Sequence, residues 1–505
     1  MPTKTVPSLD HIILEDFSGG WNSRDAASQV ANNESPECLN VTLDVRGGFQ
    51  KRLGLTRVGS GTTIVNPSHR MFYWQKTGET IIQDGAVVRK TTDFTSFTTL
   101  KTYSTSAGAD FCDFQGKLVA VHPVDKVSVY DSATWTDIGT SPKGSTNAAW
   151  QNKVFVGGDP DNPSRVWWSN AGDPNTWTLA SAFVDLREKD NALITAIGGG
   201  TGLDDVGRGG LLVFKADSTY RIHDSGTGAF VTLHNEAGAG GPMCVATSTS
   251  GVTAFISKKG IYVTDSVSKP ELASNKIDPL FRATEINFSK QDIWCAGVHQ
   301  DRFVFSLTRG VSQTTNNFTL EYHPALGWIV PHSFGLASAA SFGTNDFKLY
   351  GASTSLPRIY SVFSGGSDDG TAITARFQTR WFEPGNGYNC RLRKLLVNGR
   401  GIASLYVKRN YSQGVGDLYP ISVIGSGFVW DSGTWGSGVW GPDLFQDFNL
   451  PFYALGIARA VSFEVQETSS ITVSGPPLLD DGAIPTVGAF AVYALYLDFV
   501  NLRYS

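Results

Sequence analysis

Three aspartates and three tryptophans occur close together between residues 159 and 177, a combination that could bind and cleave a polysaccharide. They are Asp159, Asp161 and Asp173, with Trp167, Trp168 and Trp177. A glycosidase needs two carboxyl groups about 5–9 Å apart across a cleft. The surrounding segments GDPDNP and GDPNT are also ordinary turn sequence, because Asp, Asn, Gly and Pro are typical turn residues. We therefore expect turns here, and a polysaccharide-degrading enzyme remains an alternative.

Residues that could serve as metal ligands or nucleophiles are scattered along the chain. The eight histidines include no HExxH pair, and no GxSxG segment marks a hydrolase nucleophile. The run GGGTGLDDVGRGG at 198–210 lacks the Lys-Ser/Thr pair of a phosphate-binding loop. Neither Asp159/Asp161 nor Asp368/Asp369 matches an EF-hand loop. The sequence therefore predicts no enzymatic activity, no metal and no cofactor.

The five cysteines are far apart in the chain and form no CxxC pair. They are Cys38, Cys112, Cys244, Cys295 and Cys390. This spacing argues against a disulfide framework or a zinc cluster. We expect buried free thiols in a protein made in a reducing cytoplasm.

An unusual segment, FVWDSGTWGSGVWGPD, spaces Trp430, Trp435 and Trp440 five residues apart. An odd step on a strand alternates faces, so the glycines must turn or bulge the chain between the rings. The tryptophans could form an exposed platform for glycan or subunit contact. The favoured interpretation is that they cap the core of the C-terminal part, because buried Trp contributes a large apolar area.

The composition predicts an all-β protein that binds nucleic acid weakly. Gly 55, Trp 13, Tyr 16 and Phe 30 stand beside only Met 3, which favours strands and tight turns. The net charge of −5 argues against a basic nucleic-acid grip, although it permits a channel through which DNA passes without sticking. The first residues lack the apolar core of a signal peptide, and no apolar run is long enough to predict a membrane span.

Seven apolar, strand-like segments recur at intervals typical of propeller blades. They begin near Gly78, Lys117, Lys153, Leu211, Val252, Arg302 and Lys348. Subtracting neighbouring positions gives steps of 39, 36, 58, 41, 50 and 46 residues. Four-stranded blades repeat at roughly 40–50 residues. The spacing favours a β-propeller of about seven blades over a set of sandwich domains, with six or eight blades as alternatives.

Composition changes after residue 366, and the pattern predicts three parts. Residues 1–67 form an extended N-terminal arm with the first strands, and residues 68–366 form the propeller. Residues 367–505 form a β-rich, sandwich-like C-terminal domain, because segments such as ASLYVKRNY alternate apolar and polar side chains. The arm contains two GG pairs and a basic end with Arg46, Lys51 and Arg52. It could pair with a strand edge of its own propeller or of a neighbouring subunit.

The segment Phe17–Gly54 carries the most specific sequence. It combines a GG-x-N opening, the tripeptide LNV and a closing Gly-x-x-x-Arg-x-Gly. The segment resembles the N-terminal part of the propeller-bearing tail proteins of tailed bacteriophages, the nozzle, hub and tail-tip components. The resemblance continues in SRVWWSNAGDPNTW, LLVFKADSTYRI, KKGIYVTDS and the stretch from ARFQTRWF to RLRKLLVNGRG, in the same order along most of the chain.

This resemblance implies a structural component of the virion tail. Such a component assembles as a homo-oligomeric ring around the DNA path and contacts other tail or head–tail connector proteins. Trp430, Trp435, Trp440, Arg46, Lys51 and Arg52 are then candidate interaction residues. A receptor- or glycan-binding tail module is the second hypothesis, and a polysaccharide-degrading tail enzyme is the third.

Overall fold

The computed structural model describes most of the chain, and its described residues fall into two compact units. The described residues are 9–44, 47–59, 64–66, 68–186, 191–199, 210–224, 229–342, 348–384, 388–400, 402–412, 414, 416–422, 447–467 and 491–501. The propeller unit comprises Arg57–Pro324 and Ser333–Val362. The two-sheet unit comprises Met1–Thr56, Ala325–His332 and Phe363–Ser505.

The propeller unit consists of small antiparallel sheets, each built from strands that follow one another in the chain. The first three blades are β8 (Ser68–Trp74), β9 (Glu79–Asp84), β10 (Val87–Thr91) and β11 (Thr98–Thr102); β12 (Asp110–Phe114), β13 (Lys117–Val121), β14 (Ser128–Tyr130) and β15 (Trp135–Asp137); and β16 (Thr146–Trp150), β17 (Lys153–Gly157), β18 (Arg165–Trp168) and β19 (Phe183–Asp185). The next two are β20 (Ile194–Gly198), β21 (Leu211–Lys215), β22 (Thr219–Asp224) and β23 (Ala229–Asn235); and β24 (Val245–Thr247), β25 (Thr253–Ser257), β26 (Gly260–Thr264) and β27 (Glu271–Leu272).

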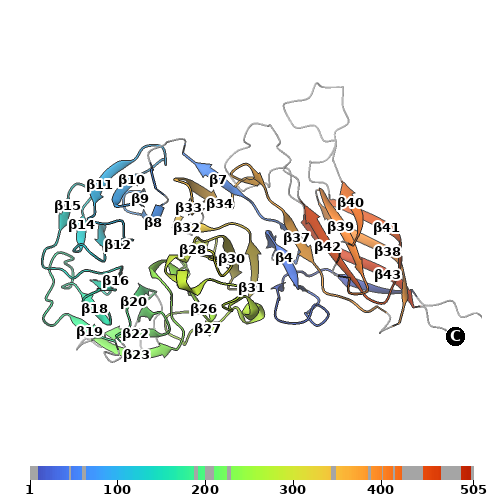
Figure 1. Ribbon diagram of the computed structural model, residues 1–505, viewed down its shortest axis with the longest axis horizontal. Coiled ribbons are helices and arrows are strands. Elements are labelled where there is room, and N and C mark those ends of the chain that lie inside the picture. Colours follow the sequence, from blue (N-terminus) through green and yellow to red (C-terminus); the bar gives the residue numbers. More distant parts are fainter. Residues whose placement is uncertain are drawn as a thin grey trace, which may run out of the picture. The chain divides into compact units, whose positions relative to one another are not determined.

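Two further blades complete the unit. The sixth contains β28 (Cys295–His299), β29 (Arg302–Leu307) and β30 (Phe318–His323). The seventh contains β32 (Leu336–Phe342), β33 (Lys348–Ser353) and β34 (Ile359–Val362), and its sheet continues into β7 (Leu55–Val58), whose Arg57 and Val58 belong to this unit. Short 3₁₀ helices lie at Pro242–Cys244, Asn275–Leu280 and Phe288–Ile293. Figure 1 shows the sheets of this unit arranged around a common centre.

Tight hairpins explain why these segments form short paired strands. The turn between β16 and β17 places Gln151 and Asn152 at φ 43° and 60°, and that between β28 and β29 places Gln300 and Asp301 at φ 50° and 60°. Two-residue turns with positive φ at both positions match the right-handed twist of antiparallel strands. Each inner hairpin therefore returns the chain directly along the strand that it has just formed.

Apolar layers between adjacent blades hold the propeller together, and one of them closes the ring. Met71 and Ile82 of the first blade pack with Ala340, Ala352 and Ile359 of the last. The inner strands β8 and β32 also contact each other directly. The seven predicted central strands correspond to β9, β13, β17, β21, β25, β29 and β33. The prediction of an all-β chain with a propeller of about seven blades is confirmed for the residues that the structure describes.

The two-sheet unit is the predicted sandwich, but it contains more of the chain than expected. One sheet has the order β41 (Asp447–Ala458), β38 (Cys390–Arg400), β43 (Ala491–Asn501), β6 (Phe49–Lys51) and β5 (Val41–Leu43), and β1 (Leu9–Leu14) also pairs with β43. The other has the order β4 (Glu37–Leu39), β37 (Ala375–Gln378), β42 (Val461–Glu467), β39 (Ile402–Arg409) and β40 (Asp417–Ser422). Smaller elements are β2 (Gly20–Trp21), β3 (Glu34–Ser35), β31 (Trp328–His332), β35 (Ser367–Asp368) and β36 (Thr371–Ala372).

The core of this unit lies between its two sheets. Leu395 and Leu497 of the first sheet share one buried cluster with Val407 and Phe463 of the second. Burying such side chains contributes roughly 1.5–3 kcal/mol each.

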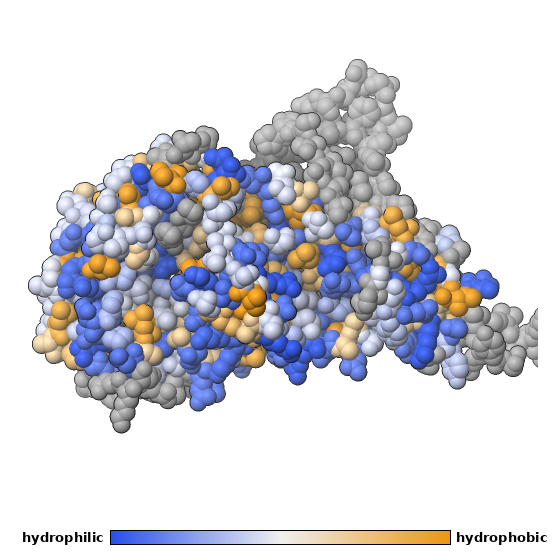
Figure 2. All heavy atoms as spheres, viewed as in Figure 1, coloured by the Kyte–Doolittle hydropathy of each residue, from blue (hydrophilic) through white to orange (hydrophobic). Residues whose placement is uncertain are grey.

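On the face drawn in Figure 2, hydrophobic residues lie in small groups among hydrophilic ones, as is usual for a protein surface.

The expected boundaries at residues 67 and 366 differ from those in the structure. Instead of forming an extended arm, the N-terminal segment supplies strands to both sheets of the two-sheet unit: β4 pairs with β37, and β1 and β6 pair with β43. The physical reason is that Phe17 and Phe49 are almost fully buried in the core of that unit. Few apolar residues occur in this segment, but Phe17, Val41, Leu43 and Phe49 are core residues.

Candidate functional site

Asp159, the first of the predicted carboxylates, organises a turn. Its carboxylate accepts hydrogen bonds from the Trp167 indole Nε1 (3.3 Å), the Asn162 side-chain amide (3.1 Å) and the Asp161 backbone N–H (3.0 Å). The residue is only 4% exposed. All of these donors are local in sequence, so the carboxylate shapes the loop between β17 and β18.

Asp173 has the same role in the following loop. It accepts hydrogen bonds from the Asn175 backbone N–H (2.9 Å) and the Thr176 hydroxyl (2.5 Å), and the Thr176 hydrogen bond contributes most to lowering its pKa. The Trp177 indole donates to the Pro174 carbonyl at 2.9 Å, and Trp177 packs with Trp167 in the core between the second and third blades. Asp159 and Asp173 therefore lie in turns, as their surrounding sequence predicts.

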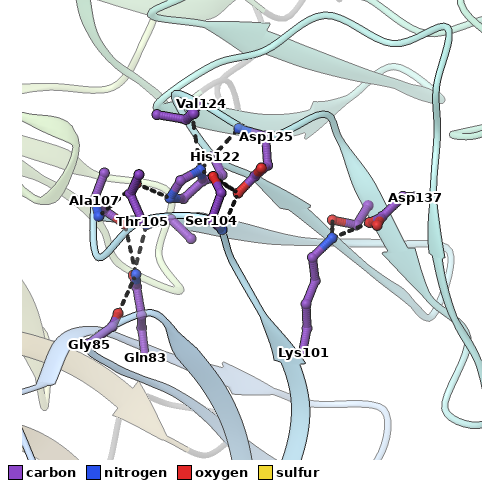
Figure 3. A network of polar contacts seen from close by, with 12 residues as sticks. Gln83, Gly85, Lys101, Ser104, Thr105, Ala107, His122, Val124, Asp125 and Asp137 are labelled. Atoms are coloured by element: carbon purple, nitrogen blue, oxygen red, sulfur yellow. Dashed lines mark hydrogen bonds and ion pairs between the residues drawn. The ribbon is translucent and has the colours of Figure 1, made fainter.

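A polar network around His122 joins several titratable residues of the propeller, and sequence reasoning missed it (Figure 3). The His122 ring stacks on Tyr103 with centroids 4.4 Å apart. Its Nε2 lies 3.4 Å from the Thr105 hydroxyl, and its Nδ1 lies 3.2 Å from Asp125 Oδ2. Asp125 also accepts hydrogen bonds from the backbone and hydroxyl of Ser104. The only sequence signal was the spacing HPVD, which places an Asp three residues after a His.

The network superficially resembles a Thr–His–Asp catalytic relay, but its hydrogen bonds indicate a structural role. The backbone N–H groups of Val124 and Asp125 point at His122 Nδ1, at 3.3 and 3.1 Å. Nδ1 therefore carries the lone pair of the neutral ring and Nε2 carries the proton. A protonated Nε2 donates to Thr105 and does not take a proton from it. The network ties the loop Tyr103–Ala109 to the loop between β13 and β14.

Buried histidines predict that the propeller loses stability in mild acid. Burial lowers the pKa of His299 to about 4, and desolvation also lowers the pKa of His122. The unfolded chain then binds more protons between pH about 6.5 and 4, so the free energy of unfolding falls as pH decreases through that window. Denaturant titrations at a series of pH values measure this slope. We expect His299→Gln to reduce it, and an unchanged slope in that variant would refute the assignment.

The cysteines are buried, as expected, and none of those in the described ranges forms a disulfide. Burial raises the pKa of every one, that of Cys244 to about 12. The Cys244 thiol donates to the carbonyls of Gln291 and Trp294, both at 3.5 Å. Within the same part of the chain, no group of three or more His, Cys, Asp or Glu side chains could hold a metal ion.

The predicted interaction residues have different outcomes. Trp430, Trp435, Trp440 and Arg46 lie outside the described residues. Lys51 and Arg52, the other candidate interaction residues of the basic end, are buried within this chain. They are 5% and 2% exposed, because β6 is an internal part of the two-sheet unit.

Arg52 belongs to a buried hydrogen-bond network built from the N-terminal motif residues. Its guanidinium makes a two-pronged ion pair with Asp368, at 2.8 and 2.7 Å. Its Nε donates to the Asn40 side-chain carbonyl at 2.9 Å, and the Asn40 amide donates to the Thr374 carbonyl at 2.7 Å. Gly54 lies directly against the backbone of Ser367, because a Cβ at this position would lie 2.0 Å from the Ser367 carbonyl oxygen. The LNV and Gly-x-x-x-Arg-x-Gly motifs therefore join the N-terminal segment to residues near 370.

The GG-x-N motif forms a second small network at the start of the same segment. The Asn22 amide donates to Glu34 (2.7 Å) and to Asp25 (2.9 Å), while its carbonyl accepts the backbone N–H groups of Arg24 and Asp25. Gly20 has φ +77° and packs directly on Trp328, where an added Cβ would lie 2.8 Å from that of Trp328. This motif thus fixes a tight turn against the core.

Comparison with known proteins finds only remote structural likenesses. No family model matches the chain, and no curated protein sequence matches it. Among solved structures, virginiamycin B lyase from Staphylococcus aureus is 9% identical, and the match covers 62% of this chain and 99% of that one with a TM-score of 0.43. The extracellular domain of a putative hybrid two-component system from B. thetaiotaomicron is 10% identical, with 78% and 58% covered and a TM-score of 0.43.

PorZ, a surface component of the type-IX secretion system of Porphyromonas gingivalis, is 10% identical with a TM-score of 0.38. That match covers 63% of this chain and only 38% of PorZ. At these identities and TM-scores, none of the three proteins bears on what this chain does. The described residues also contain no helix with the length and apolar character needed to cross a bilayer.

Proposed function

We propose that this chain is a structural component of a bacteriophage tail that assembles as a ring around the DNA path and connects tail parts. The observation that carries the proposal is the role of the motif residues in Phe17–Gly54. Asn22, Asn40, Arg52 and the glycines beside them form the buried networks that build the two-sheet unit. The segment that resembles the tail proteins is therefore also a segment that builds the two-sheet unit.

The hydrogen bonds at the candidate sites favour a structural protein over an enzyme. Asp159 and Asp173 are engaged in local turns, and the hydrogen bonds around His122 give it a structural role. Two of the three carboxylates that suggested the polysaccharide-degrading alternative therefore shape turns, and the third, Asp161, forms an exposed ion pair with Lys143.

The charge balance suits a protein that lets DNA pass. With a net charge of −5, the chain gains little from the release of counterions that draws basic proteins onto DNA. A weakly repelling surface would allow DNA to slide past without being held.

The composition of purified phage particles tests the proposal. Tryptic peptides of this chain are expected in particles purified from cells that make it, in a fixed ratio to the major tail proteins. Particles that contain every other tail protein but none of these peptides would rule the proposal out.

A further inference from the structure

The first sheet of the two-sheet unit has two open edges of useful length. In the described part of the chain, β1 pairs only with β43 and β41 pairs only with β38. Two of the other edge strands, β4 and β5, have only three residues each, and very short edge strands protect a sheet from pairing with another chain. The remaining edge strand of the second sheet, β40, has six residues, which include Pro420. β1 and β41 have six and twelve residues. Pro451 removes one N–H from β41, while the other residues of that strand keep theirs.

The directions of these strands permit head-to-tail pairing between copies. β1 is antiparallel to β43, β43 to β38, and β38 to β41, so β1 and β41 run in opposite directions. A second copy in the same orientation therefore places its β1 antiparallel to β41 of the first. The sheet then continues from subunit to subunit, and neighbouring strands remain antiparallel across the joint. Because two different edges meet, this is a heterologous contact, the kind that a closed ring needs.

Two rows of cross-strand neighbours in the sheet define a register for this joint. One row runs Ile13–Tyr496–Leu396–Pro451, and the next runs His11–Asp498–Lys394–Tyr453. Continuing both rows without a shift places Pro451 opposite Ile13 of the next copy and Tyr453 opposite His11.

Large apolar side chains are exposed at both edges. Ile13 is 48% exposed on β1, and Tyr453 and Ile457 are 64% and 47% exposed on β41. Cross-strand aromatic and β-branched pairs are the contacts that stabilise a sheet. Joining the two edges would cover these side chains.

The β1 edge is acidic, since Asp10, Glu15 and Asp16 lie in or directly after β1. The β41 edge carries one charged residue, Asp447, and the basic residues Arg391, Arg393 and Lys394 lie on β38, the next strand in. Like charges repel, so the charges disfavour β1 against another β1.

We infer that the partner of the β1 edge is the β41 edge of a second copy of this chain, paired antiparallel with Tyr453 opposite His11. The inference rests on the proposed ring function and supplies the contact that closes the ring. It concerns backbone pairing between copies, so it holds or fails independently of where on the tail the ring lies.

Disulfide trapping in the full chain tests the pairing. Directly opposed residues on antiparallel strands have Cβ atoms about 4.5–5.5 Å apart, which is within reach of a disulfide after small adjustment. The double variant His11→Cys/Tyr453→Cys is expected to give a ladder of cross-linked oligomers on mild oxidation. Mixing the two single variants should give dimers only, and each single variant alone should give none. The native thiols are buried with raised pKa values, so they add little background.

Three results would overturn the inference. Dimers of His11→Cys alone would show that β1 pairs with itself around a two-fold axis. If light scattering shows that the double variant self-associates but oxidation gives no ladder of cross-linked oligomers, the contact between copies lies elsewhere. A chain that stays monomeric as its concentration rises would remove the contact altogether.

A second pair of variants guards against loss of folding. Ile13→Lys adds a charge to an edge residue that is 48% exposed, and Val124→Lys adds the same charge to a propeller residue that is 46% exposed. We expect Ile13→Lys to abolish the ladder in the double-cysteine background and Val124→Lys to leave it intact. Equal ladders would contradict the inference. A missing ladder in a chain that is present in particles refutes the edge pairing alone, whereas a ladder in a chain absent from particles refutes the tail function alone.

Discussion

Replacing Arg52 by alanine is expected to lower the free energy of unfolding of the two-sheet unit by about 3–5 kcal/mol, the cost of removing one partner of a buried ion pair. The Arg52 side chain is fully buried, and that of Asp368 is 21% exposed. The substitution leaves the Asp368 carboxylate and the Asn40 side-chain carbonyl without the donors that the guanidinium provides. Because the chain has two units, hydrogen exchange of peptides from each unit measures the effect better than a single melting curve.

Arg376→Ala is the matched control for this prediction. Arg376 pairs with Glu37 at 2.7 Å in the same unit, but the two side chains are 35% and 47% exposed. Exposed pairs contribute about 0–1 kcal/mol. If amide hydrogens of the two-sheet unit exchange at the same rate in both variants, the buried Arg52–Asp368 ion pair does not stabilise this unit as we expect.

Replacing Phe377 by alanine is expected to cost about 3–5 kcal/mol, the usual range for removing a buried aromatic ring. The Phe377 ring stacks on Phe49 at 4.2 Å and meets the edge of Phe17 at 5.6 Å. These two partners come from the N-terminal segment, so the variant should loosen that segment as well as β37. Faster hydrogen exchange in peptides covering residues 9–56 is the specific readout.

The control for Phe377 is Tyr388→Ala in the same unit. Tyr388 is 60% exposed, and surface substitutions usually change stability by less than about 0.5 kcal/mol. Protection of residues 9–56 that survives Phe377→Ala would mean that the N-terminal segment is held by something other than this aromatic cluster.

The propeller could be predicted because its pattern is local. Each blade repeats an apolar central strand bounded by turn residues, and segments such as LLVFK and KLVAV became the second strands β21 and β13. The hairpin that precedes a central strand is formed within a few residues, as at Gln151 and Asn152. Pairing of this kind leaves a periodic signal in the chain itself.

The membership of the N-terminal segment in the two-sheet unit could not be predicted in this way. Arg52 and Asp368 are separated by 316 positions, and β1 pairs with a strand near residue 500. No local pattern records such contacts, and a basic residue in a glycine-rich segment suggests an exposed position. The GG-x-N and LNV motifs did mark the segment as specific, but only the structure explains them as buried networks.

The site chemistry was predictable where it depends on turn residues and unpredictable where it depends on tertiary contacts. The segments around Asp159 and Asp173 form the turns that their composition suggests. The His122 network depends on the Tyr103 ring and Ser104 from the loop between β11 and β12, which no spacing in the sequence reveals.

Cryo-electron microscopy of intact particles tests the central proposal most directly. We expect several copies of this chain around the tail axis, with the DNA path through the centre of the ring and a continuous sheet from β41 of one copy to β1 of the next. A well-resolved tail in which no density fits the propeller and two-sheet units of this chain would contradict it.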